Sequence, residues 1–258
     1  MQARLGWVAL VVAGMMSAAP RTLFAFFGGQ PESCAEVRAL NPSAPDGDYL
    51  ISPAGFQFQV YCFDMAGTPR EYLTFLHTGS SLNFAQYFAD ATDYVVTHYT
   101  RIRLDPATLL IDISDQTFAS STLTGHVGNG PITVTSMPYG VAMACQGCGL
   151  AGGGANVDVR GLPFKVANTW VLGGACASGT TTLSANDQVV DVTGGGYCGW
   201  NSPAPLYNPF NTTGGFDVQL IPMPPLVAPA PALSPTLMAL TVAALVALGL
   251  LRLRRQVG

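Results

Sequence analysis

Six cysteines, all between residues 34 and 198, constrain this chain more than any other feature of its sequence. An even number of cysteines in an exported chain is typical of a disulfide framework. Six cysteines allow 15 pairings, and their number alone does not select one. The residues expected to form three disulfides are Cys34, Cys62, Cys145, Cys148, Cys176 and Cys198.

The first 25 residues indicate the export that such a framework requires. Arg4 gives a short positive region, and residues 5–16 form an apolar stretch too short to span a bilayer comfortably. Small residues at 17–19 offer one cleavage site, Leu23-Phe24-Ala25 is a rival site, and the choice between them stays open. An uncleaved N-terminal anchor is the alternative, but length and the early arginine favour a signal peptide over residues 1–25.

The C-terminal residues predict a linker followed by a membrane helix. Residues 222–235 contain six prolines, a composition typical of an extended, semi-rigid spacer. Residues 236–258 then form an apolar segment with a basic end, which predicts a transmembrane helix whose arginines lie on the cytoplasmic side. Those arginines are Arg252, Arg254 and Arg255.

This C-terminal layout resembles the IPTL-CTERM variant of the PEP-CTERM bacterial sorting signals. The short motif Pro231-Ala232-Leu233-Ser234-Pro235 stands directly before the apolar segment, as in those signals. The resemblance implies processing by an exosortase-type enzyme. It also implies transient residence in the inner membrane, then the cell surface or extracellular matrix of a Gram-negative bacterium. A plain C-terminal membrane anchor is the alternative.

Charge is scarce in this chain and unevenly placed. All 15 acidic residues, but only six of the 11 basic residues, lie between residues 32 and 217. The resulting excess of negative charge repels phosphate backbones, so the sequence argues against nucleic acid as a partner.

Alternating apolar and polar residues predict a mainly β domain over residues 31–221. Residues 56–62 place their apolar side chains on one face, as in a half-buried strand. Residues 94–104 alternate similarly, with Arg101 and Arg103 expected to face outward beside Tyr99. Further short strands, separated by Gly, Pro and Asn, are expected at 109–113, 132–135, 156–159, 170–172, 188–192 and 216–221.

Two short segments are expected to be helical. Ser33 can cap a helix over residues 33–40, with Glu36 at the spacing of a capping box, and Asn41-Pro42 ends it. Residues 83–88 are expected to form one or two helical turns. The predicted fold is therefore a single disulfide-stapled antiparallel β domain with one or two short helices, plus apolar helices at both ends of the chain.

A series of short motifs carries a family resemblance. Their order resembles the GON domain, the C-terminal module of some secreted animal ADAMTS metalloproteases, over nearly all of residues 31–221. The opening also resembles fibrinogen-like domains, whose later tryptophan-rich pattern is missing here. The motifs are Ser33-Cys34-Ala35-Glu36-Val37, Asp46-Gly47-Asp48-Tyr49-Leu50, Val60-Tyr61-Cys62 with Met65, Pro69-Arg70-Glu71-Tyr72-Leu73, Asn83-Phe84 and Gly195-Gly196-Tyr197-Cys198-Gly199.

The GON resemblance implies a protein-recognition module and supplies no catalytic residues. In the animal proteases the zinc site lies in a separate domain, so zinc and peptidase activity are associations of the family name. Fibrinogen-like domains pair the cysteines that resemble Cys34 and Cys62, which supports a bond between these two. Pairings Cys145–Cys148 and Cys176–Cys198 are then expected as the most local set.

Catalytic patterns are missing from the sequence. The histidines lack the His-Glu-x-x-His spacing that brings two imidazoles to one zinc ion, and no Gly-x-Ser-x-Gly pentapeptide occurs. We therefore predict no catalytic residue, no metal ligand and no cofactor, and interpret the histidines as surface or structural residues. The histidines are His77, His98 and His126.

Three other patterns favour structural roles over chemistry. Cys145 and Cys148 have the spacing of a redox motif, but the surrounding glycines favour a loop and a structural disulfide. Asp112 and Asp115 are interpreted as hydrogen-bonding turn residues rather than a catalytic carboxylate pair. The glycines at 194–196 are expected to permit tight turns beside the last cysteine.

Aromatic residues near the last cysteine are the main candidates for binding. They lie in a proline-containing stretch between residues 196 and 214, and loops on a rigid scaffold often carry binding residues. The alternative is that these side chains pack under their own loop. The candidates are Tyr197, Trp200, Tyr207 and Phe210.

The sequence thus predicts an exported, cell-surface module that binds a protein or a glycan. An envelope hydrolase with a site assembled from dispersed residues is one alternative, and a structural matrix component without a discrete ligand is another. The missing catalytic patterns favour binding. The expected partners are the protein or glycan ligand, an exosortase-type enzyme, and the membrane through the C-terminal helix.

Overall fold

A computed structural model of the chain describes residues 29–167, 169–204 and 217–223. The predicted signal peptide over 1–25, the helix over 236–258 and all but the first two residues of the linker lie outside these ranges. In the part of the chain that is described, no helix has the length and apolar character needed to cross a membrane.

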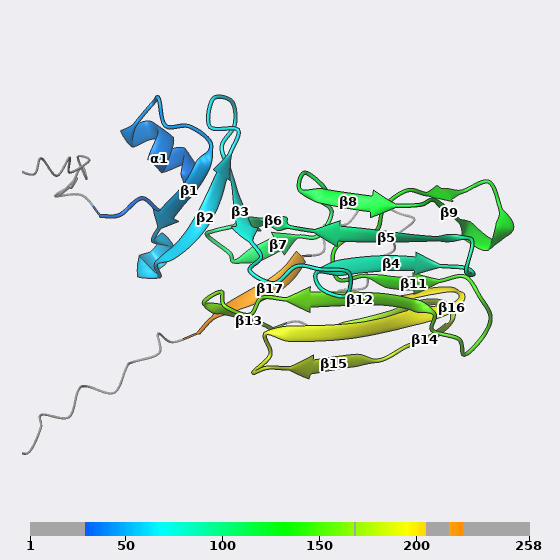
Figure 1. The fold of residues 1–258 in the computed structure, drawn as a ribbon. Helices are drawn as coiled ribbons and strands as arrows, with labels where there is room; N and C mark the ends of the chain where they lie inside the picture. The colour runs from blue at the N-terminus through cyan, green and yellow to red at the C-terminus, as the bar shows by residue number, and fades with distance from the viewer. Residues whose placement is uncertain (1–28, 168, 205–216, 224–258) are drawn as a thin grey trace, which may run out of the picture.

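The described residues form one α-helix, two short 3₁₀ turns and 17 strands, shown in Figure 1. In chain order they are α1 (Cys34–Leu40), β1 (Gly47–Ile51), η1 (Pro53–Gly55), β2 (Phe58–Phe63), β3 (Arg70–Thr74), β4 (Phe84–Phe88), β5 (Tyr94–Tyr99), β6 (Arg101–Asp105), β7 (Leu110–Asp112), β8 (Ala119–Thr122), β9 (Gly125–His126), η2 (Val127–Asn129), β10 (Thr133–Val134), β11 (Ala142–Ala144), β12 (Gly153–Asp158), β13 (Phe164–Val166), β14 (Trp170–Ser178), β15 (Thr181–Ser184), β16 (Val189–Pro203) and β17 (Asp217–Pro222).

Helix α1 begins and ends where the sequence predicts. The hydroxyl of Ser33 accepts a hydrogen bond from the backbone N–H of Glu36 at 3.2 Å. The carboxylate of Glu36 in turn accepts from the backbone N–H of Glu32 at 2.8 Å, one residue before the position a capping box would use. Asn41 is the C-cap, and Cys34 on the inner face is fully buried.

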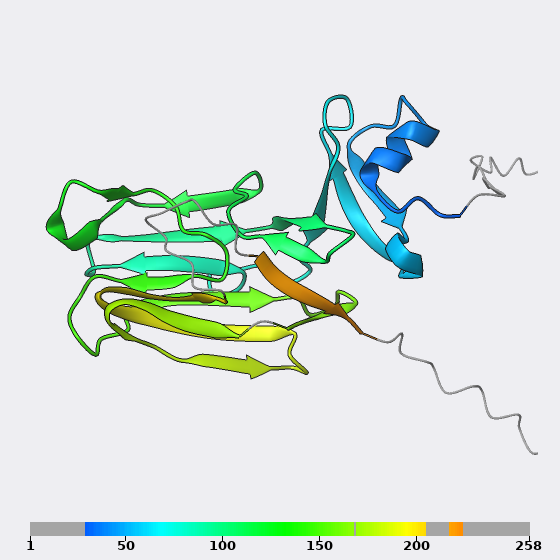
Figure 2. The same cartoon turned by 180° about the vertical axis from the view of Figure 1, so that it is seen from behind.

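The first sheet holds seven antiparallel strands in the order β1-β2-β3-β6-β7-β17-β13. Its first three strands lie with α1 at one end of the molecule (Figure 1). Strand β17, orange in Figure 2, comes from the end of the described chain and pairs with both β7 and β13. This pairing ties the last described residues to the middle of the domain.

The second sheet has the order β11-β16-β12-β4-β5-β8, with β14 and β15 also paired to β16. Strand β16 is 15 residues long, so its first half pairs with β12 and β15 and its second half with β11 and β14. The pairing of β11 with β4 is parallel, and β9 and β10 form a separate ribbon. The fold is therefore mainly antiparallel β, as predicted.

One hydrophobic core joins the two sheets. Leu73 and Ile102 enter it from the first sheet, Tyr87 and Val157 enter it from the second, and all four are completely buried. Each buried aliphatic or aromatic side chain contributes about 1.5–3 kcal/mol by leaving water. Because the same cluster includes side chains from α1 to β17, the described residues pack as one unit.

Two local predictions are wrong. The helical turns expected over residues 83–88 are replaced by strand β4 (Phe84–Phe88), because Ala85 and Tyr87 point inward while Gln86 lies between them, a period of two. Residues 94–104 form two strands in different sheets rather than one strand. The break is at Thr100, where burial changes from odd to even positions, so that Tyr99 is buried rather than outward-facing.

The disulfide between Cys34 and Cys62 forms as expected and joins α1 to β2. It spans 28 residues of sequence and lies wholly inside the core, where both cysteines are fully buried. In the chain-entropy account, closing a loop of this length stabilises the folded state by about 3–4 kcal/mol.

The local pairing expected for the other four cysteines is wrong. Cys145 bonds to Cys198, and Cys148 bonds to Cys176. The reason is the pairing of β11 with β16, which sets the residue after β11 beside the Cys198 segment with Cα atoms 3.8 Å apart. Each cysteine of the Cys-x-x-Cys pair therefore reaches a separate strand, and the described residues contain no free cysteine.

The glycines at 194–196 belong to strand β16 and do not form the turns that the sequence predicts. A β-carbon on Gly194 would lie 2.2 Å from the carbonyl oxygen of Ala142 on the neighbouring strand. A β-carbon on Gly195 would lie 2.6 Å from the carbonyl oxygen of Leu150. These glycines therefore allow backbones to approach closely around the long strand.

Candidate functional site

The predicted aromatic candidates near the last cysteine separate in the structure. Tyr197 lies in β16 with 69% of its surface exposed, whereas Trp200 in the same strand is only 7% exposed and belongs to the core. The prediction of Trp200 as a binding residue is therefore wrong, since residues 189–203 form a strand rather than a loop. Tyr207 and Phe210 lie outside the described residues.

The histidines and the carboxylate pair do not assemble a site. His77 and His126 are exposed, and His98 is partly buried on β5. Nδ1 of His126 lies 3.4 Å from Oδ1 of Asp93. Within residues 29–167, 169–204 and 217–223, no three side chains of His, Cys, Asp or Glu gather closely enough to hold a metal ion. Asp112 accepts hydrogen bonds from the backbone and hydroxyl of Ser114 at 3.0 and 2.6 Å, which is a turn role.

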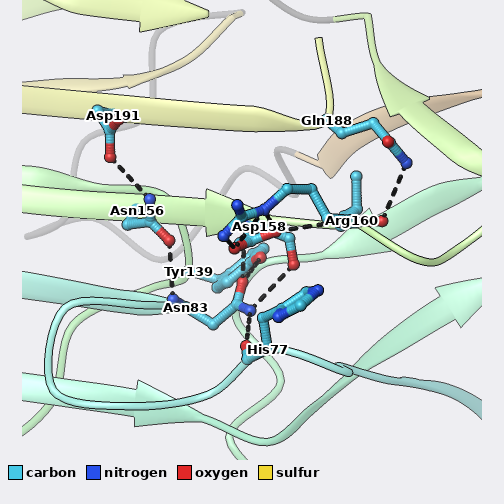
Figure 3. Close-up of polar contacts among 9 residues, drawn as sticks. His77, Asn83, Tyr139, Asn156, Asp158, Arg160, Gln188 and Asp191 are labelled. Carbon is cyan, nitrogen blue, oxygen red and sulfur yellow. Dashed lines mark hydrogen bonds and ion pairs between the residues drawn. The ribbon is translucent and has the colours of Figure 1, made fainter. Parts of the chain in front are cut away.

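Figure 3 shows a buried polar network centred on Asn83. Its Nδ2 donates to the carbonyl oxygens of His77 and Asp158, at 2.9 and 3.0 Å. Its Oδ1 accepts from the N–H of Asp158 at 2.9 Å and from the hydroxyl of Tyr139 at 2.6 Å. Both polar atoms of the Asn83 side chain therefore make two hydrogen bonds each. The backbone N–H of Asn83 also donates, to Oδ1 of Asn156 at 3.0 Å.

An ion pair lies next to this network. The side chain of Asp158 is completely buried, while that of Arg160 is 41% exposed and its Nε donates to both carboxylate oxygens, at 3.0 and 3.1 Å. Burial opposes ionisation, but the hydrogen bonds and charge of Arg160 outweigh it, so the pKa of Asp158 lies below its ordinary value. A carboxylate held ionised in this way is a poor proton donor, so we interpret the network as structural support.

A cluster of arginine and aromatic side chains lies on the outer side of β2, β3 and β6. Tyr61 pairs with Tyr72, and Phe63 pairs with Arg70, so these four side chains share one face. Tyr72 also pairs with Arg103, and Arg101 follows two positions away on the same face. We call this the arginine–aromatic face and include Phe118, which reaches it from the segment before β8.

Phe118 packs edge-on against three rings of this face. Its ring centroid lies 4.8 Å from that of Tyr72, 5.4 Å from that of Phe63 and 5.7 Å from that of Tyr61. Aromatic pairs at these distances contribute about 0.5–1.5 kcal/mol beyond their buried area. The rings therefore form a fixed platform on the sheet.

Two arginines cover the faces of these rings. The guanidinium carbon of Arg101 lies 4.0 Å from the centroid of Tyr61 and 5.0 Å from that of Phe118. The guanidinium carbon of Arg70 lies 5.3 Å from the centroid of Phe63. Such cation–π contacts hold the long side chains in place, so less rotamer entropy is lost when a ligand binds.

The hydroxyl of Tyr72 is anchored beneath the platform. It donates to Asp115 at 3.0 Å and lies 3.2 Å from the hydroxyl of Thr117. Burial and the charge of Asp115 raise the pKa of Tyr72, so the hydroxyl stays protonated and available as a donor. Asp115 is therefore a structural residue of this surface.

A groove of about 450 Å³ adjoins the arginine–aromatic face at the ends of β3 and β6. Glu71 on its wall is partly buried, and burial raises the pKa of this carboxyl although the backbone N–H of Cys34 donates to it at 2.7 Å. The groove offers both guanidinium donors and carboxylate acceptors. Its lining includes Arg70, Glu71, Arg103, Asp105, Asp112 and Ser114.

Sequence reasoning found only part of this surface. Alternation indicated that Arg101 and Arg103 face outward, but it placed them beside Tyr99, which is buried in the other sheet. Their real neighbours, Tyr61 and Phe118, are set by strand pairing and by a loop distant in sequence. In the strand predicted over residues 56–62, Tyr61 alternates with the apolar residues and so lies on the polar face. This alternation was the local signal that Tyr61 faces outward.

Comparisons with known proteins agree with the motif resemblance. The model of the GON domain family matches residues 31–95 and 88–207. The chain is also 25% identical over 201 residues to "A disintegrin and metalloproteinase with thrombospondin motifs gon-1" of Caenorhabditis elegans. That match covers 67% of this chain but only 9% of the longer relative. No solved structure matches the chain.

Proposed function

Because this chain belongs to the GON domain family, we propose that it is an exported recognition module that binds a protein or a glycan. The observation that carries the proposal is the arginine–aromatic face. Arginine, tyrosine and phenylalanine are enriched at protein interfaces, and arginine and tyrosine are among the residues that dominate binding energies. Here they form a preorganised cluster on a chain otherwise poor in basic residues.

Two features of this face and one comparison favour recognition over catalysis. The Tyr72 hydroxyl is hydrogen-bonded to Asp115, and burial raises its pKa, so it is a poor nucleophile, while Arg70 and Arg101 are stacked on rings. The platform of this face is rigid, which lowers the entropy cost of binding. The relative gon-1 is named a metalloproteinase, but the matched part is 9% of its length, so peptidase activity is not carried to this chain.

The experiment is a binding screen of the full-length chain against arrays of purified glycans and surface proteins. We expect a ligand whose capture falls about tenfold or more in Arg101→Gln, since that change removes the cation over two rings. Lys165→Gln is the matched control, because it removes the same charge from β13, three strands away in the sheet order.

Three outcomes of this screen would overturn the proposal or move its binding site. A ligand whose capture is equal in Arg101→Gln and Lys165→Gln would move the binding site elsewhere on the chain. Turnover of an arrayed glycan or peptide by the full-length chain would support the envelope hydrolase instead. Absence of any ligand, with normal assembly into the cell-surface matrix, would support a structural matrix component.

We also propose that the chain reaches its working place by two terminal signals. The sequence of residues 1–25 supports export, and the linker, short motif, apolar segment and arginines of residues 222–258 support sorting by an exosortase-type enzyme. The proposed route passes through the inner membrane of a Gram-negative bacterium and ends at the cell surface or extracellular matrix.

A further inference from the structure

Two arginines in the groove have guanidinium groups without hydrogen bonds to the described residues. Arg70 stacks on Phe63, and its Nε is buried without a hydrogen-bond partner. Arg103 has one ion-pair neighbour, Asp112, at 3.7 Å, which is longer than a hydrogen bond. Both side chains line the same groove.

The other three arginines of the described chain each make at least one hydrogen bond. Arg160 donates to both oxygens of Asp158, Arg101 donates to the hydroxyl of Thr74 at 3.0 Å, and Arg38 donates to the carbonyl oxygen of Gly67. The two guanidinium groups for which the described residues provide no hydrogen bond therefore both line the groove. A guanidinium binds a carboxylate with two parallel hydrogen bonds, so the groove favours an anionic group.

Acceptors stand beside these donors. Asp105 uses Oδ1 to accept from the backbone N–H of Ala107 at 2.9 Å, and Asp112 uses Oδ1 to accept from Ser114. Neither carboxylate has a hydrogen bond to its Oδ2 within the described ranges. These second oxygens can accept hydrogen bonds from hydroxyl groups.

Building on the proposed function, we propose that the groove binds an acidic polysaccharide, a glycan that carries one carboxylate per sugar ring. Such a sugar presents a carboxylate for Arg70 and Arg103 and hydroxyls for Asp105 and Asp112. An acidic peptide offers a similar charge but few hydroxyls for Asp105 and Asp112. A densely sulfated polymer carries more negative charge per sugar ring, so the carboxylates of the groove and the negative charge of the domain oppose it more strongly.

The position of the groove favours a ligand that is bound by side chains rather than by backbone hydrogen bonds. It lies over β3, β6 and β7, whose backbone groups pair with neighbouring strands. An extended peptide gains affinity from backbone hydrogen bonds at a free sheet edge, and none is offered here. A sugar chain keeps its remaining hydroxyls in water and needs no such edge.

The test measures binding of the full-length chain to oligogalacturonate by titration calorimetry. The same oligosaccharide with its carboxylates methyl-esterified is the neutral control. We expect the charged form to bind at least about tenfold more tightly than the ester, and to lose about tenfold or more in Arg70→Gln and in Arg103→Gln. Lys165→Gln should bind as the unmodified chain does.

A second pair of variants separates loss of the guanidinium from loss of the fold. Arg103→Lys keeps the charge but not the two-pronged geometry, so we expect it to bind at an affinity between those of the unmodified chain and Arg103→Gln. Circular dichroism checks that each variant folds. Should Arg70→Gln fail to fold, the Arg103 series decides the question, since the side chain of Arg103 is 43% exposed.

Several results would overturn this inference. Equal binding of oligogalacturonate and its ester, no binding of either, or unchanged binding in Arg103→Gln would each remove the groove as an acidic-sugar site. Tighter binding of heparin or of a glutamate-rich peptide would assign the arginines to another ligand class. If any such result accompanies an array ligand that depends on Arg101, the proposed recognition function stands while this inference fails.

Discussion

The side chain of Asn83 binds both backbone groups of Asp158, accepting from its N–H at 2.9 Å and donating to its carbonyl oxygen at 3.0 Å. These two hydrogen bonds use the same backbone groups of Asp158 that a neighbouring strand would use, and they join two residues 75 positions apart. It fixes the end of β12 against the start of β4. Because Asp158 carries the ion pair to Arg160, the same contact positions the charged pair as well.

We expect Asn83→Ala to lower the free energy of unfolding by about 3 kcal/mol or more, because it leaves several buried polar groups without partners. Asn186→Ala is the matched control. Both asparagines have positive φ, 49° and 58°, so the backbone penalty is shared and the difference reports the hydrogen bonds. Urea unfolding measures both variants, and equal losses would contradict the structural role of the Asn83 side chain.

Asp158→Asn should change how stability depends on pH. The pKa of Asp158 in the folded chain lies below its ordinary value of 3.8. Its contribution is therefore present above that pH and is lost as the pH falls through the folded-state pKa. We expect the stability gap between the unmodified chain and Asp158→Asn, about 2–4 kcal/mol near neutrality, to shrink toward pH 3.

Asp187→Asn is the comparison for that measurement. Its ion pair with Lys165 is 3.6 Å long, and both side chains are well exposed, so its removal should cost less than about 1 kcal/mol. A gap for Asp158→Asn that stays constant from pH 7 to pH 3 would argue against an ionised Asp158 in the folded chain.

Paired cysteine variants test the two long-range disulfides. Cys148→Ser with Cys176→Ser removes one bond and should leave Cys145 and Cys198 bonded, with no free thiol. Cys148→Ser with Cys198→Ser removes one partner from each bond and should lose about 2–4 kcal/mol more. Thiol titration and thermal unfolding distinguish the two, and equal losses with two free thiols in each double variant would favour the local pairing.

Gly194→Ala tests the close approach of β16 to β11. Its β-carbon would meet the carbonyl oxygen of Ala142 at 2.2 Å, so the strands must move apart. We expect a loss of about 1–3 kcal/mol in urea unfolding. Gly47→Ala, also in a strand, would meet nothing closer than 3.8 Å and should change stability little. A tolerated Gly194→Ala would show that the strands are looser than described.

The C-terminal sorting proposal predicts a shortened mature chain. Intact-mass measurement of the surface fraction should recover chains that end near Leu233 and lack residues 236–258. Arg252, Arg254 and Arg255 would hold the precursor in the inner membrane until that step. Chains that still end at Gly258 and occur in the inner membrane alone would leave a plain anchor as the better account.

Local patterns predicted the elements whose cause is local. The cap at Ser33 and the alternation over 56–62 are decided by neighbouring residues, and both helix and strand formed there. The strand β16 was missed over most of its length because its glycines resemble turn residues. These glycines are needed because β11 lies close to β16, and a contact between distant strands cannot be inferred from a local sequence pattern.

The candidate site was predictable only in fragments. Outward-facing Arg101 could be inferred from alternation, but its position over the ring of Tyr61 depends on the order β2-β3-β6. Thr100 shows the same limit, since a single residue shifts the alternation and sends the chain into the other sheet. Strand order and phase shifts are tertiary properties, and they decide which side chains meet.

Cys145 and Cys148 bond to distant cysteines rather than to each other, and this affects how the disulfides of the domain form. Under the proposed export from the N-terminus, these two thiols would reach the oxidant before Cys176, and Cys198 would arrive last. A bond between the first two would then have to be reopened by thiol–disulfide exchange before β16 settles, a step that takes seconds to hours. We therefore expect maturation to depend on a disulfide isomerase, and its depletion should accumulate a form bridged between Cys145 and Cys148.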